Sequence, residues 1–233
     1  VLNVCNFAKG SPTLLSFDDA RTLFHEFGHA LHQILSNVTY EPLSGTSVSR
    51  DFVELPSQLF EHWLTVPEVL KRFAVHYKTK SPISEKLMER LIGASNYDMG
   101  YQTVEYTSSA LVDLYFHLED TEKDVMELQN EILSKIGLPE AIKMRHATPH
   151  FAHVFSGGYY AAAYYSYMWS EVMDADAFSA FEELDNPFDA NLAKSLEDNI
   201  LSKGNSLDPE IAYKRFRGSL PKVDALLRGR GLI

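Results

Sequence analysis

The sequence predicts a mainly α-helical domain, with at most a small β element near residues 38–50. Apolar residues recur at spacings of three and four, most clearly at residues 97–118 and 161–184. Pairs of cap residues and prolines, of the kind that start helices, divide much of the remainder into shorter segments. The 233 residues, 45% of them hydrophobic, suffice for one core, and no repeat or linker divides them. We therefore expect a single domain covering residues 1–233.

The first helix is predicted to begin after Ser16. Apolar residues follow at helical spacing through residue 35. Ser16 is a suitable N-cap, Asp19 can complete a capping box with it, and Asp18 suits the positive end of the helix dipole. This segment is therefore expected to be an amphipathic helix with a well-defined start.

A second helix is predicted from Asp51, after a loop around Gly45. Residues 38–50 contain β-branched and turn residues, so a short extended element is allowed there. From Asp51 onward, apolar side chains recur at helical spacing. Pro56 is expected in the first turn of this helix, where a missing N–H is tolerated. The polar positions of the helix form one stripe: Glu54, Gln58 and Glu61.

The later helices are predicted from their start and stop signals. Three pairs of cap and first-turn residues mark starts: Thr65 with Pro67, Ser81 with Pro82, and Thr121 with Asp124. Gly137 and Gly204 are predicted to end helices, because glycine adopts the left-handed conformation that often closes them. Two shorter helices are expected from Phe188 and from Pro209.

Composition excludes several classes of partner. The formal net charge of -11 opposes binding to nucleic acid phosphates and to anionic membrane surfaces. No apolar run is long enough to span a bilayer. Cys5 is the only cysteine, so no internal disulfide can form, which fits the cytoplasm. The sequence gives no sign of an oligomeric state.

Two histidines one helical turn apart give the first helix a chemical signature. His25 and His29 flank Glu26 in the run His-Glu-Phe-Gly-His, so both imidazoles face one side of the helix. Imidazole is a preferred zinc ligand, and a neighbouring carboxylate can take the proton of a metal-bound water that attacks a carbonyl. The pattern predicts a catalytic zinc site with Glu26 as general base. The alternative is two surface histidines on a helix.

Spacing alone leaves the third zinc ligand open. A histidine six residues after His29 is excluded, because Leu35 stands there. A glutamate from the next helix is the other common solution, and Glu54 is favoured over Glu61 because it lies nearer the helix start. A solvated stripe of carboxylates explains the same residues without a metal. His32, one turn past His29, is expected beside the site or at its rim.

Two separate motifs together resemble the thimet oligopeptidase family of zinc peptidases, and within it the peptidyl-dipeptidases. They are residues 24–32 (FHEFGHALH) and residues 44–58 (SGTSVSRDFVELPSQ). The similarity runs the whole length of the chain. It implies a zincin-like helical catalytic domain, zinc as cofactor, short peptides as substrates and Glu54 as the third zinc ligand.

The resemblance also implies roles for a tyrosine-rich stretch, residues 155–169, called the tyrosine segment below. Its counterpart in the family is a glycine-containing loop that leads into a helix near the substrate. The implied catalytic residues are Tyr160, Tyr167 and His153, and the implied substrate-binding residues are Tyr164, Arg50, Gly157 and Gly158. The loop is one residue longer than the common family version, and we prefer Tyr160 to Tyr159 because it can share a helix face with Tyr164 and Tyr167.

These assignments have alternative explanations that do not involve substrate. Tyrosines at such spacings often form an aromatic core stripe, and Arg50 can be a structural arginine at a helix start. Family members are much longer than this chain and resemble two helical lobes around a channel. The chain matches the C-terminal part and starts at Val1 rather than Met, so we expect a fragment of a longer two-lobed protein.

The predicted reaction is zinc-dependent hydrolysis of short peptides with release of C-terminal dipeptides. An endo-acting oligopeptidase of the same family is the first alternative. The second is a zinc-stabilised domain without catalysis that binds peptides or partners, whose signature would be loss of Glu26 or a fourth protein ligand. The sequence shows neither. Cobalt or manganese can occupy the same kind of ligand set.

Overall fold

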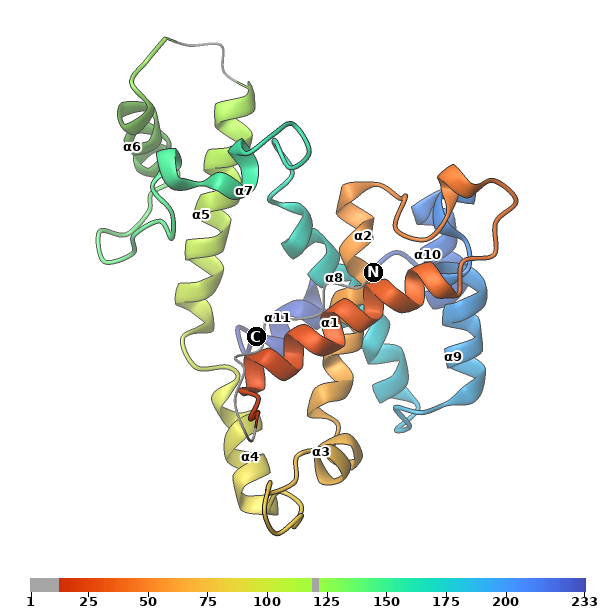
Figure 1. The fold of residues 1–233 in the computed structure, drawn as a ribbon. Helices are drawn as coiled ribbons and strands as arrows, with labels where there is room; N and C mark the ends of the chain where they lie inside the picture. The colour runs from red at the N-terminus through yellow and green to blue at the C-terminus, as the bar shows by residue number, and fades with distance from the viewer. Residues whose placement is uncertain (1–12, 119–121) are drawn as a thin grey trace.

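The structure is a computed structural model that describes residues 13–118 and 122–233 (Figure 1). Its described residues are mainly helical, which confirms the predicted fold class. The α-helices are, in chain order, α1 (Phe17–Ile34), α2 (Arg50–Glu61), α3 (Pro67–Phe73), α4 (Glu85–Ala94), α5 (Met99–Leu118), α6 (Val125–Lys135), α7 (Ala152–Phe155), α8 (Ser166–Glu183), α9 (Ala190–Leu196), α10 (Pro209–Arg217) and α11 (Val223–Gly229). Residues 38–50 contain the 3-10 turn η1 (Glu41–Leu43) in place of a strand. Within the described ranges, β pairing is limited to one bridge between Val75 and Pro82.

Local capping explains where several helices begin. The Ser16 hydroxyl accepts the Asp19 N–H at 3.0 Å and the Asp19 carboxylate accepts the Ser16 N–H at 2.8 Å, so the predicted capping box of α1 is present. Asp124 caps α6 by accepting the N–H groups of Met126 and Glu127. Its predicted companion Thr121 lies outside the described residues.

Two predictions about helix starts are wrong. α4 begins at Glu85 after Ser84, whose hydroxyl accepts the Leu87 N–H, whereas Ser81 and Pro82 belong to the turn beside the β bridge. α2 begins at Arg50, so Pro56 lies in its interior rather than in its first turn.

The interior position of Pro56 has a cost. Proline there removes the hydrogen bond to the Phe52 carbonyl and disfavours a helix by about 3 kcal/mol. Tertiary packing must offset this cost, and half of the residues of α2 are buried. Its buried residues are Phe52, Glu54, Leu55, Pro56, Ser57 and Leu59.

The prediction of one helix over residues 161–184 is also wrong at its start. α8 begins at Ser166, and Ala162 adopts a left-handed conformation with a φ of 57°. The Asp113 carboxylate accepts the N–H groups of Ala162 and Tyr164, which holds this turn outside the helix. Helical periodicity in the sequence continues through this turn, and only the contact with α5 reveals where the helix begins.

The main core lies where α2 packs between α1 and α8 (Figure 1). Leu55 and Leu59 of α2 are almost completely buried against the aromatic face of α8, where Phe178 and Phe181 stand. Each such side chain contributes roughly 1.5–3 kcal/mol through its burial. Residues of α9, α10 and the π-helical turn η4 (Glu197–Leu201) complete this core.

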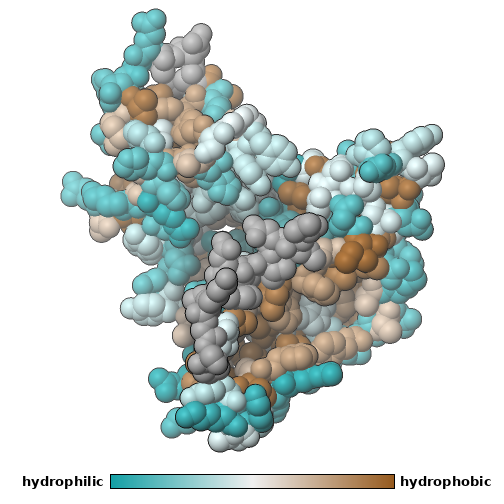
Figure 2. Space-filling model, in the orientation of Figure 1, coloured by the Kyte–Doolittle hydropathy of each residue, from teal (hydrophilic) through white to brown (hydrophobic). Residues whose placement is uncertain are grey.

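A second group of helices, α5, α6 and α7, stands to one side of this body in Figure 1. Its own clusters include Val112 and Leu128, and Phe151 with Val154. Arg230, after α11, joins the two groups because its guanidinium donates to Glu171 of α8 and Thr103 of α5. Figure 2 shows apolar side chains along the middle of one face and polar ones toward its ends. None of the described helices combines the length and apolarity that a bilayer crossing requires.

An acid-base pair between half-buried His62 and buried Asp174 ties the end of α2 to α8. His62 Nε2 lies 2.7 Å from Asp174 Oδ1, and the His62 ring stacks on Phe178 at 4.6 Å. Burial raises the pKa of Asp174 to about 7, against the opposing effect of His62. Burial lowers the pKa of His62, but Asp174 and the negative charges of Glu61 and Glu182 outweigh it and raise that pKa above its ordinary value.

We expect the free energy of unfolding to fall as pH rises from about 4. An unfolded aspartate loses its proton at about pH 4 and an unfolded histidine at about pH 6.5, whereas the pKa values of Asp174 and His62 are both raised in the folded protein. Each proton that the folded state binds in excess lowers the free energy of unfolding by up to about 1.4 kcal/mol per pH unit. Urea unfolding of the full-length protein at several pH values, followed by tryptophan fluorescence, to which Trp63 beside Phe178 contributes, measures this. His62→Gln/Asp174→Asn should flatten the profile, whereas His76→Gln, in an exposed turn, should leave it unchanged. A profile that the double variant does not flatten would contradict the expectation.

Candidate metal centre

α1 presents His25 and His29 on one side, one turn apart, as the sequence predicted. Their rings meet edge to face, with centroids 5.0 Å apart and an interplanar angle of 87°. Both side chains are about one-fifth exposed, so they line the surface of the core rather than open solvent. The capping box at Ser16 fixes the start of α1, and therefore which side of the helix carries the two rings.

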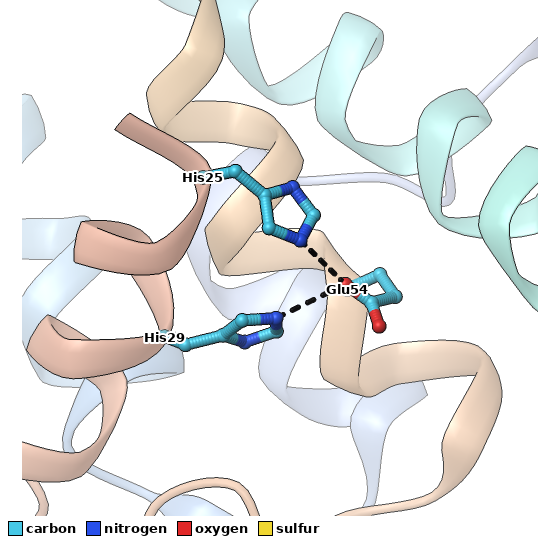
Figure 3. Close-up of side chains that lie close together, drawn as sticks. All are labelled: His25, His29 and Glu54. Atoms are coloured by element: carbon cyan, nitrogen blue, oxygen red, sulfur yellow. Dashed lines mark ion pairs between the residues drawn. The ribbon is translucent and has the colours of Figure 1, made fainter. Parts of the chain in front are cut away.

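α2 brings Glu54 to the same point (Figure 3). Its Oε2 atom lies 3.3 Å from His25 Nε2 and 3.1 Å from His29 Nε2. Glu54 is 7% exposed, which excludes the solvated carboxylate stripe as an explanation for it. The structure thus brings together the three residues that were predicted as metal ligands.

The three donor atoms fit a metal ion. One ring nitrogen from each histidine and one carboxylate oxygen all lie within 4.8 Å of one another. Zinc bonds of about 2.0–2.2 Å place tetrahedral ligands about 3.3–3.5 Å apart. The distances of 3.3 and 3.1 Å from Glu54 to the two rings are close to that separation. Two imidazoles and one carboxylate are also a ligand set that catalytic zinc sites use.

Charge in the centre favours a cation. Burial raises the pKa of Glu54, but hydrogen bonds and charges from His25 and His29 outweigh burial and hold it well below its usual range. Burial lowers the pKa of His25, but Glu54 and Glu61 outweigh burial and raise that pKa to about 10. Glu54 is therefore anionic at neutral pH, and a bound metal ion would take the place of a proton on His25.

Two further residues orient these groups, and the sequence did not assign either role. Glu61 Oε1 lies 2.7 Å from His25 Nδ1, so the rival candidate for third ligand contacts the other nitrogen of the ring. This contact favours the tautomer that leaves Nε2 free to bind a metal. Ser57, fully buried, donates to Glu54 Oε2 at 2.9 Å. The spacing of seven between Glu54 and Glu61 was the available signal, because it places both on one helix face.

Gly28 lies between the two histidines and lets α1 approach α2. A Cβ atom at Gly28 would lie 2.6 Å from the Pro56 carbonyl oxygen and 2.6 Å from Ser57 Cα. Both are backbone atoms, so a side chain at Gly28 would push the helices apart. The distance between the histidines and Glu54 therefore depends on a residue without a side chain.

Glu26 follows His25 on α1 and is partly buried. Within residues 13–118 and 122–233, its carboxylate forms no hydrogen bond or ion pair, so it is not occupied by another group. His32, which was expected beside the site or at its rim, is fully buried. Its ring nitrogens have no hydrogen-bond partner in the described residues. Burial, with a contribution from the charge of His29, lowers the pKa of His32 to about 4.

The tyrosine segment gathers its rings around His153. The centroids of Tyr160, Tyr164 and Tyr167 lie 4.7, 5.3 and 5.6 Å from that of His153. The Tyr167 hydroxyl lies 3.1 Å from His153 Nε2. The three tyrosines do not share one helix face, because only Tyr167 lies in α8. That part of the prediction is wrong, although the segment's turn still brings the rings together.

The hydroxyls of Tyr160 and Tyr167 are suited to donate hydrogen bonds. Burial raises the pKa of Tyr160, and the negative charge of Glu54 raises it further. The same two causes raise the pKa of Tyr167. Both groups therefore stay protonated at neutral pH, and Tyr160 lines the same cavity as His29 and Glu54.

A cavity of about 290 Å³ lies beside this centre. Its lining residues are His29, Thr46, Val48, Arg50, Val53, Glu54, Tyr159, Tyr160 and Ser166. The Arg50 guanidinium lies 3.2 Å from the centre of the Tyr159 ring, and its Nη1 atom is buried without a hydrogen-bond partner in the described residues. Tyr159 lines the same cavity as Tyr160. Gly157 and Gly158 precede them and border open space, since a Cβ on either would meet no atom within 4 Å.

Comparison with known proteins matches the whole chain. The model of peptidase family M3 covers residues 1–232. A dipeptidyl carboxypeptidase of Escherichia coli K12 is 42% identical over 240 residues, which cover 100% of this chain and 35% of that protein. Oligopeptidase A of the same organism is 40% identical, covering 98% and 34%. A thimet-like oligopeptidase of Dictyostelium discoideum is 35% identical, covering 98% and 35%. The chain thus spans about one third of the length of these relatives.

Proposed function

This chain belongs to peptidase family M3, the thimet oligopeptidase family that its motifs predicted, and from this premise we propose that it is the metal-binding catalytic part of a peptidase. The chain is proposed to be part of a longer, two-lobed protein that acts on short peptides in the cytoplasm. One observation carries the proposal: His25, His29 and Glu54 converge from two helices, with Glu26 beside them.

Zinc is the proposed metal, held by His25 Nε2, His29 Nε2 and Glu54 Oε2. Two nitrogens and one oxygen are common zinc ligands, and three protein ligands leave a position for water or substrate. Zinc held there would polarise the peptide carbonyl and lower the pKa of a bound water. Glu61 supports this assignment because it fixes the orientation of His25 from the opposite ring nitrogen.

Glu26 is the proposed general base and later general acid. It accepts the proton of the attacking water and returns it to the leaving amine. Tyr160 and Tyr167 donate hydrogen bonds to the oxyanion of the tetrahedral intermediate, which stabilises the charge that develops there. His153 holds the Tyr167 hydroxyl in place from 3.1 Å.

The substrate is proposed to bind along the cavity beside the metal centre. Arg50 lines the cavity and has a buried guanidinium nitrogen available for a substrate acceptor. Tyr164 packs against His153 and Tyr167. Gly157 and Gly158 give the backbone of the tyrosine segment freedom to move around a bound peptide.

We propose release of C-terminal dipeptides as the reaction. Digestion of a short peptide with a blocked N-terminus by the zinc-loaded full-length protein should yield a free dipeptide first. Amidation of the C-terminus should suppress this product if the carboxylate is recognised. Chelation of the metal should stop cleavage of both peptides. Mass spectrometry of early products identifies the cleaved bond.

Internal cleavage of both peptides would instead support an endo-acting oligopeptidase. The relatives named oligopeptidase A and thimet-like oligopeptidase, at 40% and 35% identity, favour this as the second candidate. Retention of zinc without cleavage of either peptide would contradict both candidates and support a non-catalytic metal-binding domain.

A further inference from the structure

α5 holds the turn of the tyrosine segment through one buried carboxylate. Asp113 is completely buried, and its Oδ1 atom accepts the Ala162 N–H at 3.0 Å while Oδ2 accepts the Tyr164 N–H at 2.9 Å. Each oxygen therefore receives a backbone donor from the turn that precedes α8. A carboxylate has two acceptor oxygens and no donor, which is the chemistry that two N–H groups require.

Two neighbours on the same face of α5 complete this arrangement. The Tyr106 hydroxyl donates to the Tyr164 carbonyl, and the Tyr106 ring stacks on that of Tyr164 at 5.0 Å. His117 Nδ1 lies 2.9 Å from Asp113 Oδ1, and its ring stacks on Phe155 at 5.4 Å. Spacings of seven and four place Tyr106, Asp113 and His117 along one side of the helix. We call Tyr106 and Asp113 the α5 clasp.

The clasped turn is not one that its sequence favours. Ala162 has a φ of 57°, a left-handed conformation that residues other than glycine rarely adopt. Such a conformation persists where surrounding contacts determine it, and it is enriched at functional sites. Here the contacts come from Asp113, and the residues that the turn orients are Tyr160 and Tyr164 beside His153.

We propose that Asp113 is a positioning residue that sets the catalytic tyrosines against the metal centre, an inference that rests on the proposed function. Asp113 belongs to the group of α5, α6 and α7, whereas the metal ligands belong to α1 and α2. The clasp therefore joins the oxyanion-binding hydroxyls to a helix outside the metal-binding core. It acts through the backbone of Ala162 and Tyr164 and does not touch substrate.

Asp113→Asn in the zinc-loaded full-length protein tests the proposal. Asparagine has the same shape but replaces one acceptor with an NH₂ donor, so one of the two backbone N–H groups loses its partner. The turn should shift, and kcat should fall by about 100-fold, the effect of displacing a catalytic group by about 1 Å. KM should change little, because oxyanion stabilisation acts in the transition state. Metal content should match that of the parent protein.

Asp124→Ala is the matched control. Asp124 also accepts two backbone N–H groups, at 2.9 and 3.1 Å, but it caps α6 away from the metal centre. This variant should lower the thermal midpoint without lowering kcat. Tyr106→Phe should lower kcat less than Asp113→Asn, because it removes one hydrogen bond and keeps the ring stacked on Tyr164.

Hydrogen exchange gives a readout that does not depend on activity. Peptides that contain Ala162 and Tyr164 should exchange faster in Asp113→Asn than in the parent. In Asp124→Ala, the exchange rate of these peptides should equal that of the parent. Unchanged kcat, or unchanged exchange at these peptides, in Asp113→Asn would overturn the positioning role. A parent protein that binds zinc but cleaves no peptide would refute the proposed function instead, and the exchange result would still decide whether Asp113 holds the turn.

Discussion

Glu26→Gln should keep the metal bound and remove nearly all peptide hydrolysis by the full-length protein. Glu26 lies beside His25 on α1 but is not part of the set of donor atoms that could hold the ion. Glutamine keeps the shape and polarity of the side chain, yet it cannot accept the proton of the attacking water. Loss of a general base lowers turnover by about 10²–10⁴-fold. The fall should appear in kcat rather than in the affinity for peptide.

Metal analysis and initial rates on the same preparation separate the two parts of this expectation. Glu89→Gln makes the same chemical change on the exposed surface of α4 and should alter neither quantity. Turnover close to that of the parent in Glu26→Gln would remove Glu26 from the mechanism. Loss of metal in that variant would show instead that Glu26 supports the site and would leave the base unassigned.

The parts of the centre that the sequence predicted are those set within a single helix. A capping box at Ser16 and two histidines one turn apart specify their own geometry, because helical spacing determines which side chains share a face. Spacing alone did not identify Glu54 as the third ligand, since it left Glu61 as a rival candidate. The structure separates the two carboxylates, with Glu54 at the Nε2 atoms and Glu61 at His25 Nδ1.

The features that the sequence did not predict depend on contacts between helices far apart in the chain. Pro56 looks like a first-turn proline, and its place inside α2 is tolerated because α2 packs between α1 and α8. The periodicity of residues 161–184 looks helical throughout, but Asp113 takes two N–H groups from the turn and delays the start of α8. Neither signal is local, so propensity and spacing could not reveal it.

Gly28→Ala should weaken metal binding by at least about 100-fold, more than the loss of a residue that only orients a ligand. A Cβ at this position would stand 2.6 Å from the Pro56 carbonyl oxygen and from Ser57 Cα, which are backbone atoms that cannot rotate away. α1 must therefore move away from α2. Because His25 and His29 lie on α1 and Glu54 on α2, this movement lengthens the distances from Glu54 to the two histidines. Overpacking of this kind also costs about 1–3 kcal/mol of stability.

The sign of the stability change makes this test decisive. In a helix interior, alanine is favoured over glycine by about 1 kcal/mol, so helix propensity alone predicts that Gly28→Ala is stabilising. Gly93→Ala in α4 measures that propensity, because a Cβ there meets no atom within 4 Å. Both variants are made in the full-length protein. Thermal unfolding should show opposite shifts in stability for the two variants. Competition with a zinc chelator should show a loss of metal affinity for Gly28→Ala alone. If Gly28→Ala instead matched Gly93→Ala in both measurements, the close contact between α1 and α2 could not be what sets the spacing of the metal ligands.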